Sequence, residues 1–491
     1  MSKAPENRKA QGPLKKLVSK AVGLRERNEA RPTPKKTVIK PPEKRSTKRS
    51  LATLVNTAKA DRDVFKKLVK TARENRDVRQ PLKKLVSKAR DLRVHHQERH
   101  RPSGFGFALA DSIEYLDAAR WDAVTANDSL FLSRRYLRVL EEAGPKNVRQ
   151  RYALVFRGKD VVAAVAAQCV SVSLERVRKS PNERAGKTHG EVHANGGKSA
   201  AFERLEQRML VCGNLLSWGM HGVSFAEGED PTVIWPGVAE AIYRLRRADK
   251  LSGDNNFVMV KDIPDAHAES AHALSRYSYR QLETEPNMVL EISPAWRTYE
   301  DYLASLTSKY RKSAKQIEKE VIDARCRVEE LDNVEQHAER FHELYMQTHR
   351  NARLRLVTLP TEFIPTLDAH LGDDMRSTIV SRDGEVLGWV TTVRDGQTAV
   401  GYYIGFDRAA NKDFPIYFRL LQAVVDDAIK LGCRRLSLGR TALEPKARLG
   451  ARPEPLRIWI RHRIPMLNVL VRGLLHTISH HDETPERNVF K

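Results

Sequence analysis

Residues 401–450 begin with Gly401-Tyr402-Tyr403-Ile404-Gly405-Phe406 and end with Gly439-Arg440-Thr441-Ala442-Leu443-Glu444-Pro445-Lys446-Ala447-Arg448-Leu449-Gly450. Between these ends, the pattern predicts a polar loop, an amphipathic helix over 414–431 and a short strand over 435–438. A strand, a helix and a second, parallel strand form a βαβ unit. The final turn follows a buried strand and is rich in charge, so it is a candidate site for chemistry.

The rest of the segment 291–470 reads as the same mixed α/β domain. A helix beginning at Thr307 or Ser308 carries cations in its first two turns, where they oppose the helix dipole; this favours either a bound polyanion or a solvated face. A meander of three strands follows over 376–381, 386–393 and 399–406, with hairpin turns at Asp383-Gly384 and Asp395-Gly396. We expect the 414–431 helix to begin at Asp413, with Pro415 in its first turn, and to end at Gly432. A strand over 456–461 and an amphipathic segment over 465–478 close the region.

Residues 103–290 repeat the alternation of helices and strands. Helical patterns over 121–142 precede a hairpin (151–156 and 161–174), and the charged, glycine-rich stretch 175–201 reads as a disordered insertion. A strand over 209–216 leads into a glycine-flanked turn that contains His221, which indicates either a ligand site or an ordinary turn. A helix over 233–251, a strand over 257–260 and a strand over 288–292 complete this first domain.

The N-terminal 102 residues form a strongly basic arm. They hold 31 Lys and Arg against 10 Asp and Glu, a net charge of +21, so the remaining 55 basic and 52 acidic residues leave the body at only +3 of the total +24. A repeat, Leu14–Ala21, recurs at 82–89, with weaker copies at 65–72 and 51–58, and each copy has one apolar helical face. The arm is interpreted as a flexible chain with short helices. A solvated tail, an anionic membrane surface and a nucleic acid such as tRNA remain open as its surroundings.

The four cysteines are far apart in sequence and no CxxC occurs, so we expect buried thiols, with no disulfide framework and no metal site. The N-terminus has basic residues but no apolar core of a signal peptide. We therefore expect a cytoplasmic protein, with peripheral binding at the inner face of the membrane as a further option.

The order meander–helix–strand, ending in Gly439-Arg440-Thr441, Glu444-Pro445-Lys446 and Arg448-Leu449-Gly450, resembles the GNAT superfamily. The branch it resembles most contains BioF2-like and CelD-like acetyltransferase domains and the FemAB-type peptidoglycan transferases. The resemblance implies two tandem GNAT-like α/β (α+β) domains, 103–290 and 291–470, each a mixed, mostly antiparallel sheet flanked by helices. The helix end and tail over 471–491 follow them.

The resemblance implies an N-acyltransferase that moves an acyl group from acyl-CoA, as a co-substrate rather than a permanently bound cofactor, to an amine. Two alternatives stay open: a Fem-type transfer from aminoacyl-tRNA to a cell-wall precursor, and a degenerate GNAT-like binding module. The expected catalytic residues are Glu444 as base and Tyr403 or Tyr402 as acid, with strand alternation deciding which tyrosine faces inward. The expected residues for binding substrate or donor are Arg440, Lys446, Arg448, Arg408, Lys309, Arg311, Lys312 and His221.

GNAT enzymes bind the CoA pyrophosphate on a glycine-rich turn between the central strand and the next helix. The corresponding loop here, 407–413, has no glycine, and of that pattern it keeps only Arg408. An acidic residue, Asp413, stands at the expected helix start, where it opposes a phosphate.

Overall fold

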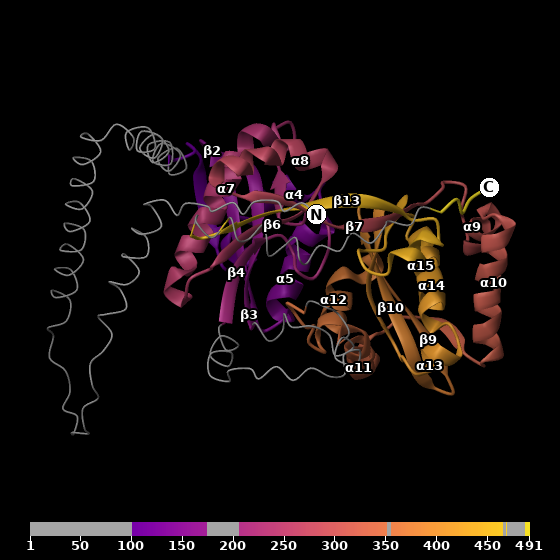
Figure 1. The fold of residues 1–491 in the computed structure, drawn as a ribbon. Helices are drawn as coiled ribbons and strands as arrows, with labels where there is room; N and C mark the ends of the chain where they lie inside the picture. Colours follow the sequence, from indigo (N-terminus) through magenta and orange to yellow (C-terminus); the bar gives the residue numbers. More distant parts are fainter. Residues whose placement is uncertain (1–100, 174–205, 351–354, 465–467, 469–486) are drawn as a thin grey trace, which may run out of the picture. The chain divides into compact units, whose positions relative to one another are not determined.

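The computed structural model describes residues 101–173, 206–350, 355–464, 468 and 487–491 (Figure 1). The basic arm up to residue 100 and the insertion predicted at 175–201 lie outside these residues. So do most of the amphipathic segment predicted at 465–478 and most of the tail. The fold described below is that of the body of the chain.

Thirteen strands form one mixed sheet. Twelve follow the order β1-β2-β3-β4-β6-β13-β7-β12-β11-β10-β9-β8, and β5 pairs with β3 at the side. Most neighbours are antiparallel, but β4 runs parallel to β6 and β11 runs parallel to β12. The strands are β1 (Gly106–Ala110), β2 (Val148–Arg157), β3 (Asp160–Ser173), β4 (Glu206–Cys212), β5 (Val223–Phe225), β6 (Phe257–Pro264), β7 (Arg280–Glu291), β8 (Arg327–Leu331), β9 (Met375–Arg382), β10 (Glu385–Asp395), β11 (Thr398–Phe406), β12 (Arg435–Ser437) and β13 (Arg452–His462).

Helices flank the sheet in both halves of the body, and the α/β class predicted from the sequence is confirmed. The first half, up to β7, holds α4 (Ala118–Thr125), α5 (Arg134–Glu142), α7 (Pro231–Ala248) and α8 (Asp265–Ala271), with short 3-10 turns at Ile113–Tyr115, Leu130–Leu132, Asp249–Ser252 and His272–Tyr277. The second half holds α9 (Tyr299–Ser305), α10 (Ser308–Asp323), α11 (Ala338–His349), α12 (Phe363–Leu371), α13 (Ala410–Asp413), α14 (Ile416–Lys430) and α15 (Leu443–Ala447), with 3-10 turns at Glu335–His337 and Gly372–Asp374.

The βαβ unit predicted over 401–450 is present as β11, α14 and β12. Residues Thr398–Val400 pair in parallel with Arg435–Ser437. The turn Asp383-Gly384 has positive φ at both residues, as a tight hairpin requires, and Gly432 closes α14 with a φ of +69°.

The predicted helix start at Asp413 is wrong. A separate helical turn, α13, ends at Asp413, and α14 begins only at Ile416. The break lies at Pro415, whose ring nitrogen carries no hydrogen to continue the helical hydrogen bonds.

The two halves exchange strands at the middle of the sheet. The last strand of the first half, β7, pairs with β12, whereas the last strand of the second half, β13, pairs with β6. The exchanged strands also pair with each other. The ladder is therefore continuous across residue 290, where the sequence suggested a boundary between two domains.

The halves also share a hydrophobic core. One cluster of buried side chains contains Trp121, Phe131 and Tyr136 of the first half together with Trp389 and Tyr402 of the second. The four cysteines are buried and unbridged, as predicted. Among the described residues, no helix combines the length and the apolar character needed to cross a membrane.

Candidate active site

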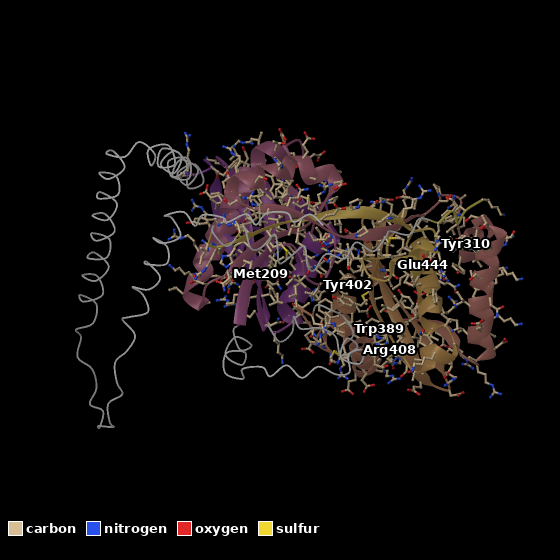
Figure 2. All side chains as sticks on the ribbon, in the orientation of Figure 1. Met209, Tyr310, Trp389, Tyr402, Arg408 and Glu444 are labelled. Atoms are coloured by element: carbon tan, nitrogen blue, oxygen red, sulfur yellow. The ribbon has the colours of Figure 1, made fainter. Side chains whose placement is uncertain are left out.

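Apart from His221, which lies in the first half, the predicted site residues are distributed over three places in the second half. The segment that follows β12 carries Arg440, Glu444, Lys446 and Arg448. The end of β11 carries Tyr402, Tyr403 and, beyond it, Arg408. The helix α10 carries the remaining predicted cations. Figure 2 shows Arg408 and Glu444 well apart, so the structure does not bring all of these groups into one site.

Lys446 is buried in α15, with 4% of its surface exposed. Its ammonium group forms no hydrogen bond or ion pair with any described residue, and the charge that acts on its pKa is that of Glu285 on β7. Burial therefore lowers the pKa of Lys446 to about 7, although Glu285 opposes the shift. Such a side chain changes its protonation state near neutral pH.

Glu444 lies on the outer face of the same short helix. Its carboxylate accepts hydrogen bonds from Arg448 (3.2 Å) and from Arg487 (3.0 Å) of the C-terminal segment. Partial burial raises the pKa of Glu444, but the hydrogen bonds from these two arginines outweigh that effect and leave the pKa below its ordinary value. The carboxylate is ionised and already paired, and Arg448 is engaged in the same contact.

Arg440 points from the end of β12 to the first half. It donates to Asp262 Oδ1 at 2.8 Å, and Asp262 is fully buried and also paired with Lys261. Asp262 has a φ of +56° and lies where β6 bulges against β13. A strained, non-glycine residue that holds a charge cluster is typical of a functional position. The local sequence around Lys261 and Asp262 gives no sign that Asp262 holds Arg440.

The two tyrosines at the end of β11 lie on the same core, which corrects the expectation that strand alternation separates them. A bulge between Thr391 and Thr392 leaves Tyr402 without a partner across the ladder, so both rings contact the shared core and lie 4.6 Å apart. Burial raises the pKa of both phenols, so both stay protonated.

Both phenol groups already have partners. The hydroxyl of Tyr402 lies 2.6 Å from that of Tyr136, which in turn accepts from Asn214, and Tyr403 donates to Leu216 O at 3.0 Å.

His221 is buried in the turn that follows β4. Its Nδ1 lies 2.7 Å from Ser217 Oγ, its ring stacks on Phe131, and Asp395 is 3.9 Å from its Nε2. Burial, assisted by the nearby charge of Lys261, lowers the pKa of His221 to about 3, so the imidazole is neutral. The structure therefore places His221 in a packed contact between the halves.

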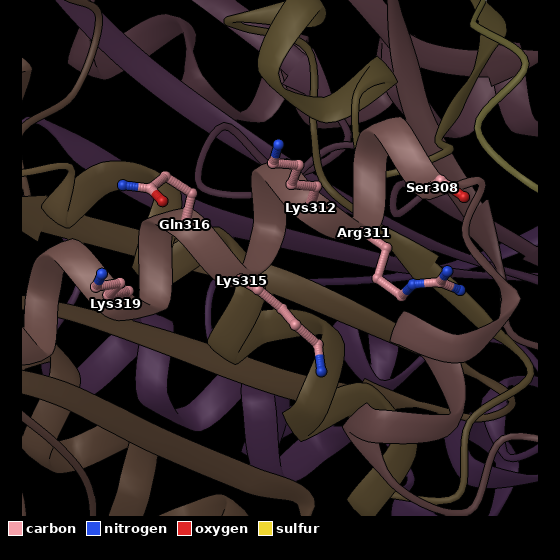
Figure 3. Close-up of a pocket in the computed structure, with 6 residues that line it drawn as sticks. All are labelled: Ser308, Arg311, Lys312, Lys315, Gln316 and Lys319. Atoms are coloured by element: carbon pink, nitrogen blue, oxygen red, sulfur yellow. The ribbon is translucent and has the colours of Figure 1, made fainter.

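The helix α10 presents a cationic face. Ser308, Arg311, Lys312, Lys315, Gln316 and Lys319 line a shallow cavity of about 450 Å³. In Figure 3, Lys312 and Gln316 form one row along the helix, while Arg311 and Lys315 form the neighbouring row. Among the described residues, Lys315 has a carboxylate partner, Glu300, at 3.8 Å, and no ion pair involves Lys312 or Lys319. Lys309 lies on the same helix, over the ring of Tyr310.

The turn before α14 does not fit a pyrophosphate. Asp407 Oδ1 accepts from the backbone N–H groups of Ala409 (2.9 Å) and Ala410 (2.8 Å), and Gln347 accepts from that of Arg408 (3.0 Å). The hydrogen bond from Ala410 is the main reason that the pKa of Asp407 is lowered. An ionised carboxylate thus occupies the donors that would receive a phosphate, while the Arg408 side chain is exposed.

An aspartate side chain also caps the start of the corresponding helix in the first half, α7. Pro231 begins α7 and has no N–H, and Asp230 caps the helix by accepting from Thr232 N at 2.8 Å. In both places, an aspartate side chain accepts from backbone N–H groups that could otherwise face a phosphate.

Comparison with known proteins supports the resemblance stated from the sequence. Residues 304–447 match the model of the acetyltransferase (GNAT) domain, which confirms that resemblance for the second half. A search of curated proteins found no match to the chain.

Three solved structures illustrate what the body is similar to. FemX is 10% identical, with a TM-score of 0.45, over 75% of this chain and 99% of its own. A tandem GNAT protein from the clavulanic acid biosynthesis pathway is 11% identical, with a TM-score of 0.41, over 73% of this chain and 98% of its own. The C-terminal domain of a proposed lysylphosphatidylglycerol synthetase from Agrobacterium fabrum is 10% identical, with a TM-score of 0.41, over 75% of this chain and 98% of its own.

Proposed function

We propose that this protein is an N-acyltransferase that moves an acyl group from an activated donor to an amine, with its chemistry at the segment that follows β12. The observation that carries the proposal is the GNAT domain match over 304–447, whose last helix, α15, contains the buried amine of Lys446. Such transfers need the donor and the amine to be positioned together and a proton to be removed from the attacking amine.

We assign to Lys446 the removal of the proton from the attacking amine. A catalytic acid or base works best when its pKa lies near the operating pH, and burial brings the pKa of Lys446 to about 7. Arg440 keeps a permanent charge, is 28% exposed, and is held by Asp262. We assign Arg440 to an anionic group of the substrate or donor.

Glu444, the base expected from the sequence, is the rival to Lys446. Its pairing with Arg448 and Arg487 supports a role in fixing α15. We therefore propose that Lys446→Met lowers the transfer rate by at least about 100-fold, whereas Glu444→Gln lowers it by less than about 3-fold. The assay is mass spectrometry of the acylated amine. A large loss of rate in Glu444→Gln with a small loss in Lys446→Met would instead identify Glu444 as the base.

Aminoacyl transfer from an RNA-linked donor to a cell-wall precursor or lipid amine is a second candidate function. The cationic face of α10, at Lys309, Arg311, Lys312, Lys315 and Lys319, favours it, because phosphate neutralisation by such a face binds nucleic acid without base contacts. Parallel assays with acetyl-CoA and with a mixed aminoacyl-tRNA pool, each with the same set of amines, separate the two donors.

A non-catalytic role is the third reading. A GNAT-like body that only binds its ligand would bind that ligand equally well in the Lys446→Met variant. No acylated product with either donor, together with unchanged binding in that variant, would favour this role over catalysis.

A further inference from the structure

The parallel ladder between β11 and β12 is short. It covers only Thr398–Val400 and Arg435–Ser437, whereas β11 continues to Phe406. In open α/β sheets, ligands bind outside the carboxyl ends of parallel strands. The space beyond Val400 and Ser437 is therefore the place where the fold of the second half would receive a donor.

A segment of the first half, Leu216–Trp218, lies across this place. On one side, the backbone carbonyl of Leu216 accepts from the Tyr403 hydroxyl of β11 at 3.0 Å. On the other side, the Trp218 indole N–H donates to Ser437 Oγ of β12 at 2.7 Å. The same three residues thus connect the two strands where their own ladder has stopped.

The indole of Trp218 packs directly on the turn that follows β12. A Cβ atom at Gly439 would lie 3.1 Å from Trp218 Cζ2, and Gly439 has a φ of +80°. A side chain at this position would displace the ring, so glycine is required for the close approach. The backbone N–H of Gly439 donates to Asn287 Oδ1 at 3.0 Å, which fixes the turn to β7.

The segment is also held from behind by buried charge. Lys261 Nζ donates to the carbonyl of Ser217 at 2.8 Å, and Lys261 is paired with the buried carboxylate of Asp262. Asp262 in turn holds Arg440 of the second half. Leu216–Trp218 is therefore held by hydrogen bonds to residues of both halves.

We propose that Leu216–Trp218 is a plug that closes the donor position between β11 and β12, and that CoA thioesters are not the donors of this protein. The inference rests on the proposed acyl transfer and narrows its donor. The plug links the two strands beyond their ladder, and Asp407 accepts from the backbone N–H groups of Ala409 and Ala410 in the turn before α14. The acyl group is thus delivered by a carrier that stays outside the strand ends.

Hydrogen–deuterium exchange of the full chain tests the plug. In Trp218→Ala, amides of residues 401–406 and 436–440 should exchange at least about tenfold faster than in the parent, because their cross-links to Leu216–Trp218 are lost. Trp218→Phe keeps most of the ring contact and loses only the indole N–H, so it should change exchange by less than about threefold. Equal exchange in the parent and in Trp218→Ala would overturn the plug. If Trp218→Ala fails to fold, Trp218→Leu replaces it with the same criterion.

Titration of the parent protein with CoA tests the donor class without any turnover. We expect no binding at millimolar CoA and no protection of residues 401–416 in exchange. Micromolar binding of CoA with protection of 406–416 would overturn the inference while leaving acyl transfer intact. Conversely, if no donor gives an acylated product in the transfer assay, this result counts against the proposed function. The exchange experiment would still test the plug independently.

Discussion

Burial and charge are in conflict at Lys446. Its pKa in the folded chain is about 7, far below the 10.5 of an exposed lysine. Below pH 7, the folded state carries a buried cation at a cost on the order of 5 kcal/mol, from about 1.4 kcal/mol per pKa unit. Because the unfolded state binds more protons between pH 7 and 10.5, stability should rise with pH across that window.

Replacing this amine should therefore stabilise the fold while it impairs the reaction. We expect Lys446→Met to raise the free energy of unfolding at pH 7 and to flatten its rise between pH 7 and 10, as measured by urea unfolding. Lys319→Met on the exposed face of α10 is the matched control and should do neither. Unchanged stability at pH 7 would mean that the amine is better solvated than its surroundings indicate.

Asp427 has the opposite pH dependence. It is buried in α14, where it accepts hydrogen bonds from Thr392 (2.9 Å) and Thr378 (3.3 Å), and burial raises its pKa to about 6. The folded state holds a proton that the unfolded state releases from pH 4 upward, so stability falls by about 3 kcal/mol between pH 4 and 6. Asp427→Asn should remove this fall. Unfolding curves of both proteins at pH 4.5 and 7.5 that differ by a constant amount would contradict the prediction.

At the scale of single elements, α10 is the surface best suited to a polyanion. Lys312→Glu with Lys319→Glu should weaken binding of a tRNA pool and lower the slope of log affinity against log salt by about two, one for each lost phosphate contact. Lys250→Glu on the first half, an exposed residue away from α10, is the control. Fluorescence titrations at three salt concentrations measure both quantities. An unchanged salt slope would remove α10 from the binding surface.

Because the two halves exchange strands, we expect each half of the molecule to depend on the other for folding. A first half that ends after β7, at about residue 297, lacks β13 and leaves the edges of β6 and β7 open. A second half that starts there lacks β7, the partner of both β12 and β13. We expect neither half to unfold cooperatively when expressed alone, and we expect the two to copurify when coexpressed. Cooperative thermal unfolding of either half alone would contradict this dependence.

The elements themselves were largely predictable because they depend on local patterns. Alternating apolar residues, the hairpin pair Asp383-Gly384 and the glycine at 432 locate the meander and the end of α14. The candidate site was less predictable. The turn after β12 was found from its charges, but sequence spacing could not show that Glu444 pairs with Arg487 or that Arg440 reaches Asp262, 178 residues away. Such contacts depend on long-range chain packing.

The sequence by itself determined the α/β class, the βαβ unit over 401–450 and the GNAT resemblance, because periodicity, turn residues and a short motif all act locally. It also revealed that the loop 407–413 lacks glycine. Only the tertiary structure decided that Lys446 is buried without a hydrogen-bond or ion-pair partner among the described residues, that both tyrosines lie on one core, and that Trp218 lies at the end of β12. These features arise where the two halves of one chain share a sheet and a core. Burial sets the pKa values of these side chains, and a side chain is buried only once that packing is complete.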